Sequence, residues 1–137
     1  MNLQRRYQNV VAEFLRRVLE DYRDRIERII LFGSVARGTA GEDSDIDILV
    51  VGDIKLDELV NISYPLLLEH GELISAKNMD IDHFNFLVQN GYSFIRNVLE
   101  EGIILYERQL KLEPEDVGVT WPGSPVAYYF YTIVYFL

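Results

Sequence analysis

The chain has 137 residues, a formal net charge of −9 and no cysteine. This length fits one domain, and apolar residues make up 49% of the chain, which is enough for a hydrophobic core. The acidic balance argues against a general nucleic-acid binder, because such proteins carry a basic face. It does not exclude a small anionic nucleotide held by a metal. Without cysteine there is no disulfide, Cys-based zinc site or thiol nucleophile, which fits a cytoplasmic protein.

The N-terminal segment predicts neither a signal peptide nor a membrane anchor. It carries basic residues, but no uninterrupted apolar stretch follows them. No apolar run in the chain reaches the roughly 18 residues that a membrane-spanning helix needs.

The first half of the chain predicts a helix followed by two strands. Apolar residues at i, i+3 and i+4 spacing indicate an amphipathic helix over residues 2–27. Two apolar strands are expected at 28–32 and 45–51. Between them, residues 33–37 turn the chain and open a short helix, and residues 39–44 form a polar loop.

The second half continues the alternation of helices and strands. Residues 56–70 predict a helix, with Pro65 as a bend or break. Residues 72–79 are a candidate third strand. The last elements are expected to be two helical segments and a short closing strand, at 82–87, 91–101 and 103–106. The sequence therefore predicts an α/β (α+β) domain, a small mixed sheet with flanking helices.

The composition changes after this region, which suggests a boundary. Residues 1–108 are expected to form the domain, and residues 109–137 a linker rich in proline and glycine followed by an apolar tail. The sequence assigns no role to this tail. An exposed apolar segment would favour oligomerisation or partner binding.

The turn between the first two strands has the residues of a phosphate site. Gly33 permits a tight turn and a close approach of ligand to backbone, and Gly38 allows the same. Ser34 offers a hydroxyl and an N–H at a helix start, a favourable place for phosphate. Arg37 adds a fork of donors suited to phosphate oxygens.

The second strand carries two acids where a buried strand seldom has any. Asp45 and Asp47 are two residues apart, so an extended strand directs both carboxylates to one face. Adjacent carboxylates repel each other unless a cation lies between them. Mg²⁺ takes oxygen ligands, usually one or two carboxylates together with substrate phosphates. The stretch 33–47 therefore indicates metal-assisted nucleotidyl transfer, and it is not a Walker loop because no Gly-Lys-Ser/Thr follows.

GSVARG followed by SDIDILV resembles the signature of the DNA polymerase β-type nucleotidyltransferase superfamily, and the short chain with its early motif resembles the minimal nucleotidyltransferases. The resemblance implies the nucleotidyltransferase fold, ATP as substrate and a Mg²⁺ site with two metal ions. It also implies that Asp45 and Asp47 are catalytic and bind the metal. The nucleotide would be held by a set of motif residues: Gly33, Ser34, Arg37, Gly38 and Ser44.

The resemblance further implies a protein partner. Such minimal proteins are typically encoded beside a HEPN-domain protein, in many pairs an RNase toxin. There the nucleotidyltransferase is an antitoxin of a type VII toxin–antitoxin system, transferring AMP from ATP to a tyrosine of the toxin. The expected partners are thus a HEPN protein and a nucleoside triphosphate. Binding to a membrane or directly to nucleic acid is not expected, and the sequence leaves open whether the protein forms an oligomer.

The superfamily usually has a third carboxylate on a later strand, acting as general base. Residues 72–79 supply none in their interior, so Asp80 is the catalytic candidate, with Asp82 as the other acid within reach. The competing interpretation is that one of them caps the next helix. If the third acid is missing, a nucleotide-binding antitoxin that acts by contact is the alternative. Modification of a small molecule is a minor reading, because aminoglycoside nucleotidyltransferases are generally longer.

Overall fold

The computed structural model describes residues 3–108, so the predicted linker and tail at 109–137 lie outside the described residues. In chain order the helices and strands are α1 (Arg5–Tyr22), the 3-10 turn η1 (Arg23–Arg25), β1 (Ile26–Phe32), α2 (Gly33–Arg37), β2 (Ile46–Gly52), α3 (Leu56–His70), β3 (Ile74–Met79), α4 (Ile81–Gln89), α5 (Ser93–Glu101) and β4 (Ile103–Glu107). None of the helices in this range is long and apolar enough to cross a membrane.

The four strands form one mixed sheet in the order β3-β2-β1-β4. β1 is antiparallel to both β2 and β4, whereas β2 and β3 are parallel. A parallel pair needs a crossover connection, and α3 supplies it. The expected mixed sheet with flanking helices is confirmed.

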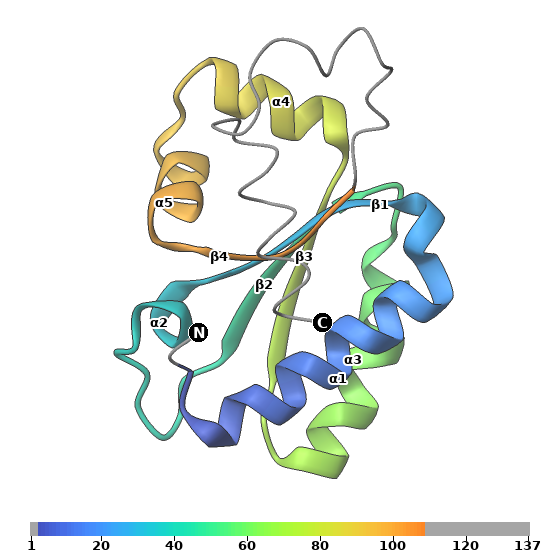
Figure 1. Ribbon diagram of the computed structural model, residues 1–137, viewed down its shortest axis with the longest axis vertical. Coiled ribbons are helices and arrows are strands. Elements are labelled where there is room, and N and C mark those ends of the chain that lie inside the picture. The colour runs from blue at the N-terminus through green and yellow to red at the C-terminus, as the bar shows by residue number, and fades with distance from the viewer. Residues whose placement is uncertain (1–2, 109–137) are drawn as a thin grey trace, which may run out of the picture.

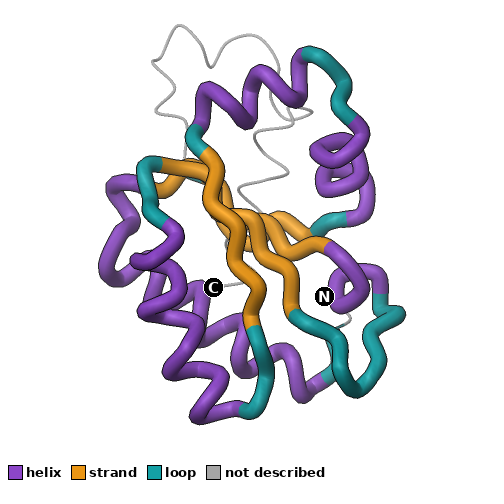
Figure 2. Tube along the Cα trace, turned by 180° about the vertical axis from the view of Figure 1, so that it is seen from behind, coloured by secondary structure: helices purple, strands orange, loops and turns teal. Residues whose placement is uncertain are grey.

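Helices cover both faces of the sheet (Figures 1 and 2). α1 and α3 pack on one face, and their apolar side chains join those of the strands in the larger core. α4 and α5 cover the other face, where Phe84, Ile95 and Val98 pack on Ile30 and Leu49. The two central strands, β1 and β2, are largely apolar because both of their faces are covered.

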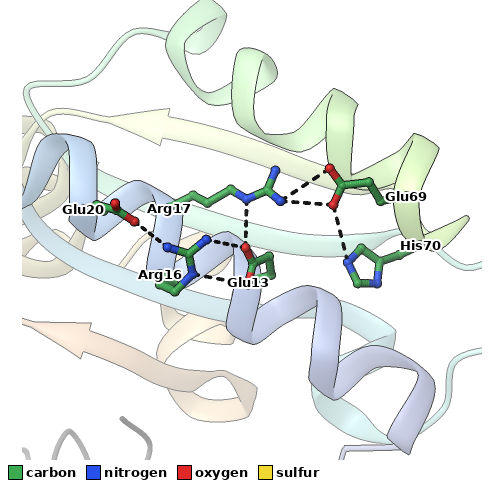
Figure 3. A network of polar contacts seen from close by, with 6 residues as sticks. All are labelled: Glu13, Arg16, Arg17, Glu20, Glu69 and His70. Atoms are coloured by element: carbon green, nitrogen blue, oxygen red, sulfur yellow. Dashed lines mark hydrogen bonds and ion pairs between the residues drawn. The ribbon is translucent and has the colours of Figure 1, made fainter.

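Charged residues join α1 to α3 along their outer sides (Figure 3). Glu13 pairs with Arg16 and Arg17 on its own helix, and Arg17 reaches Glu69 of α3 at 3.0 Å. Hydrogen bonds, first from Arg16 and then from Arg17, lower the pKa of Glu13 to about 2. The Arg17–Glu69 pair links the two helices at their surface, and surface pairs of this kind contribute only about 0–1 kcal/mol each.

The first helix is shorter than the predicted range of 2–27. It ends at Tyr22, and a 3-10 turn leads into β1, which already begins at Ile26. Ile26 continues the helical spacing from Tyr22, but it is fully buried in the sheet and pairs with Gly52 of β2. Strand pairing therefore overrides the local periodicity at this position.

The helix over residues 56–70 has the predicted bounds, yet it continues through Pro65 without a break. Four residues of its inner face, Leu59, Ile62, Ser63 and Leu66, are buried on both sides of the proline. Burial of this face offsets the backbone hydrogen bond that proline cannot donate.

Candidate active site

The predicted phosphate turn is a short helix at one end of the sheet. α2 follows β1 directly, and buried Val35 anchors it in the larger core. The helix begins at Gly33 and is followed by its C-cap Gly38, and both glycines have positive φ, 76° and 77°. Ser34 and Arg37 are thereby held on a rigid element that packs on β1 and β2.

Gly33 lies directly against the carboxylate of Asp47. A Cβ atom built on Gly33 would overlap Oδ2 of Asp47. Phe32, the residue before Gly33, is the register partner of Asp47 in the β1–β2 ladder. Position 33 thus requires glycine for two reasons, the positive φ of the backbone and the close approach of the Asp47 carboxylate.

The two acids of the motif flank the first residue of β2. Asp47 lies within the strand and is partly buried, whereas Asp45 is exposed and precedes the strand, which begins at Ile46 rather than at the predicted residue 45. In extended chain, residues two apart are about 7 Å apart. The charges of Asp45 and Asp47 are close enough to interact.

The groups around Asp47 have opposite effects on the pKa of its carboxyl group. Burial is the main influence and raises the pKa of Asp47, and the charge of Asp45 raises it further. The cations Lys77 and Arg37 lower it, Lys77 more strongly. Asp47 is therefore a carboxylate whose ionised form needs nearby positive charge, as expected of a group that binds a cation.

Lys77 is a residue of this site that the sequence analysis missed. In the parallel ladder, Ser75 of β3 stands opposite Asp47 and Lys77 stands opposite Leu49. Alternation along β3 then puts Ser75, Lys77 and Met79 on the face that carries Asp47. Only the register could have revealed this, because the sequence does not say which residue of β3 pairs with Asp47.

Arg37 is engaged by an acid from the neighbouring helix. Its Nη1 lies 3.3 Å from Oε2 of Glu101 at the end of α5, and both side chains are about half exposed, 45% and 48%. An exposed pair of this kind is weak. A phosphate group can therefore replace Glu101 at little cost.

Ser44 has a structural partner in the loop. Its Oγ accepts a hydrogen bond of 2.8 Å from the N–H of Gly41. The first turn of α1 holds the same loop, because Tyr7 and Arg6 donate to the carbonyls of Gly41 and Glu42. The structure thus shows Ser44 ordering the loop that leads into β2.

The structure places Asp80 apart from the other two acids, as the competing interpretation of a helix cap expects. Asp80 caps α4, accepting a hydrogen bond of 2.7 Å from the N–H of His83. It is five residues past Ser75, about 16 Å along the strand. Figure 1 shows α2 and the start of α4 at opposite ends of the sheet. Asp80 instead lines a separate hollow of about 470 Å³ beside Asp53.

The donor set of the site fits a magnesium ion shared with a substrate. Within residues 3–108, no group of three or more His, Cys, Asp or Glu side chains could hold a metal alone. Asp45 and Asp47 supply two carboxylates, and Mg²⁺ usually completes such a set with water and substrate phosphates. Ser34 and Arg37 lie on α2, which packs on β1 and β2.

Sequence comparisons match this region to known proteins. The family described as "Polymerase beta, Nucleotidyltransferase" matches residues 13–111, a range that includes the motif and all four strands. A protein of Methanocaldococcus jannaschii named "Putative protein adenylyltransferase" is 46% identical over 99 residues, covering 72% of this chain and 97% of the relative.

Solved structures give more distant likenesses. A "putative nucleotidyltransferase" of Sulfolobus solfataricus is 18% identical, with a TM-score of 0.48 over 77% of this chain and 86% of the other. A toxin–antitoxin structure with AMP-PNP is 22% identical, with a TM-score of 0.47 over 72% of this chain and 74% of the other.

Proposed function

Because the chain belongs to the polymerase beta nucleotidyltransferase family, we propose that it is a Mg²⁺-dependent enzyme that transfers AMP from ATP to a tyrosine hydroxyl of a HEPN-domain protein. The observation that carries the proposal is the contact between the Gly33 turn and the Asp47 carboxylate. This contact brings the turn with Ser34 and Arg37 next to the strand with Asp47, which supports binding of phosphate and metal side by side. Within this account the enzyme acts as the antitoxin of a toxin–antitoxin pair.

The choice of a protein substrate is supported by a sequence relative. A relative that matches over 97% of its own length is named as an adenylyltransferase of proteins. The HEPN partner and the tyrosine rest on the likeness of GSVARG and SDIDILV to the minimal nucleotidyltransferases. The partner and the acceptor residue are therefore the most specific parts of the proposal.

The residues of the site have separate tasks in this reaction. Ser34 and Arg37 bind the β- and γ-phosphates, and Asp45 and Asp47 hold the metal. When bound, Mg²⁺ neutralises charge on the triphosphate and orients it for in-line attack. The tyrosine oxygen forms a bond to the α-phosphorus, the bond from that phosphorus to the bridging oxygen breaks, pyrophosphate leaves, and the hydroxyl proton passes to solvent.

Transfer of label from ATP tests the proposal. The full chain is incubated with α-labelled ATP, Mg²⁺ and the HEPN protein encoded nearby. We expect a labelled partner, and a loss on the order of 100-fold in Asp45→Asn and Asp47→Asn, because each removes a charge that the transition state needs. Asp80→Asn is the matched control, since it changes the same charge at the far end of β3 and asparagine also caps helices.

One observation keeps a second function in view. The face of β3 that adjoins Asp47 presents Ser75, Lys77 and Met79, none of them an acid. A protein without the third carboxylate could neutralise its partner by contact alone. If Asp45→Asn and Asp47→Asn still neutralise the partner protein, and no label reaches that partner, the protein acts by binding rather than by catalysis.

A further inference from the structure

Lys77 stands on the strand next to the metal-binding strand, where a third carboxylate was expected. Asp47 has Ser75 as its partner across the β2–β3 ladder, and Lys77 is the next residue of β3 on the same face. The other charged residues near Asp47 are Asp45 and Arg37. Lys77 is therefore a cation at the edge of an acidic site, in a chain of net charge −9.

The arrangement puts positive charge on two sides of Asp47. α2 packs on β1 and β2 and brings Arg37 from one side, whereas β3 is the edge strand and brings Lys77 from the other. No ion pair of Lys77 occurs among residues 3–108, and its side chain is exposed. Arg37, in contrast, is paired with Glu101. Lys77 is thus a second cation of the site, and a ligand can reach it without displacing an ion-pair partner.

We propose that Lys77 binds the phosphoryl group of the nucleotide that is transferred. Ser34 and Arg37 would hold the β- and γ-phosphates at α2, and Asp45 and Asp47 would hold the metal. A triphosphate bound in this way would extend towards β3 and bring its α-phosphate to the side of Asp47 where Lys77 stands. An ammonium there neutralises the charge that develops on the equatorial oxygens during transfer.

This inference rests on the proposed function for the identity of the nucleotide, but its test measures binding as well as transfer. ATP is titrated with Mg²⁺ into the full chain and into Lys77→Met, without any acceptor. We expect Lys77→Met to bind ATP about tenfold more weakly, because a charge-assisted hydrogen bond is lost. Lys77→Arg keeps the charge and is expected to restore most of the affinity. Lys55→Met, which removes the same charge beyond the far end of β2, is expected to bind as the wild type does.

Kinetics of transfer distinguish contact with the reacting group from a general effect of charge. A lysine on the transferred phosphoryl group affects the transition state, so Lys77→Met is expected to lower kcat and to raise KM for ATP. A rise in KM alone would overturn the contact with the α-phosphate. Lys77→Asp tests the opposite assignment, because it puts a carboxylate on the same face of β3 as Ser75, the partner of Asp47. Faster transfer by Lys77→Asp would show that the position serves a base, and would overturn the inference.

Failure of this inference differs from failure of the proposed function. If the wild type and Lys77→Met bind ATP equally, Lys77 does not contact the phosphates, and the proposed function stands. If the wild type binds ATP through Lys77 but labels no partner, the inference stands and the transferase fails. If the wild type binds no nucleotide, both fail.

Discussion

Asp47 is a partly buried carboxylate that the proposed metal site needs in its ionised form, whereas burial favours the protonated form. Burial, and then the charge of Asp45, raise its pKa, while Lys77 and Arg37 compensate only in part. A carboxyl group with a raised pKa in the folded state stabilises the fold below its ordinary pKa. That stabilisation is lost as the pH rises through the raised value. At neutral pH the ionised Asp47 therefore lowers the free energy of unfolding.

We accordingly expect Asp47→Asn to raise the thermal midpoint at pH 7 without metal, because it removes the buried charge. The difference from the wild type should shrink towards pH 3, where Asp47 is protonated. Calorimetry at both pH values with a chelator measures this, with Asp80→Asn as the control for an exposed acid. A variant less stable than the wild type at pH 7 would show that the Asp47 charge is already compensated.

At the scale of elements, the junction of β1 and α2 determines the geometry of the site, because Gly33 at this junction contacts the carboxylate of Asp47. Gly33→Ala introduces a Cβ that displaces the carboxylate, and a displacement of about 1 Å can lower a rate about 100-fold. We expect AMP transfer to fall by about that factor. Backbone strain at positive φ costs a further 1–2 kcal/mol or so of stability.

Gly71→Ala separates these two effects. Gly71 has nearly the same φ, 72°, but nothing lies within 4 Å of its Cβ position. Gly71→Ala should therefore lose similar stability and keep its transfer rate, measured side by side with Gly33→Ala. Equal loss of transfer in both variants would attribute the effect to backbone strain rather than to the contact with Asp47.

The elements show where the sequence was informative and where it was not. Residues 33–37 were predicted to turn the chain and open a short helix, which they form, and the helix at 56–70 was predicted with the bounds it has. The end of α1 was misjudged because Ile26 satisfies helical spacing and strand pairing alike. The sequence left two interpretations of Asp80 open, because its place depends on where β3 ends, and the structure shows the helix cap.

For the whole molecule, the predicted mixed sheet with flanking helices is confirmed, and the donor half of the site stays a prediction. That half is local, since a single stretch from Gly33 to Asp47 carries it. The other half depends on contacts distant in sequence. Lys77 joins Asp47 through the pairing of β3 with β2, and Glu101 reaches Arg37 from α5. No periodicity in one sequence gives such a register.

The proposed function requires that Asp45 and Asp47 hold a Mg²⁺ ion and that ATP binds together with this ion. Titration of ATP with and without Mg²⁺ tests this requirement most directly. We predict that the wild type binds ATP far more tightly with Mg²⁺ than with a chelator, and that Asp45→Asn and Asp47→Asn lose this dependence, whereas Asp80→Asn keeps it. ATP binding that is equally tight with and without Mg²⁺, and unchanged in both motif variants, would contradict the account.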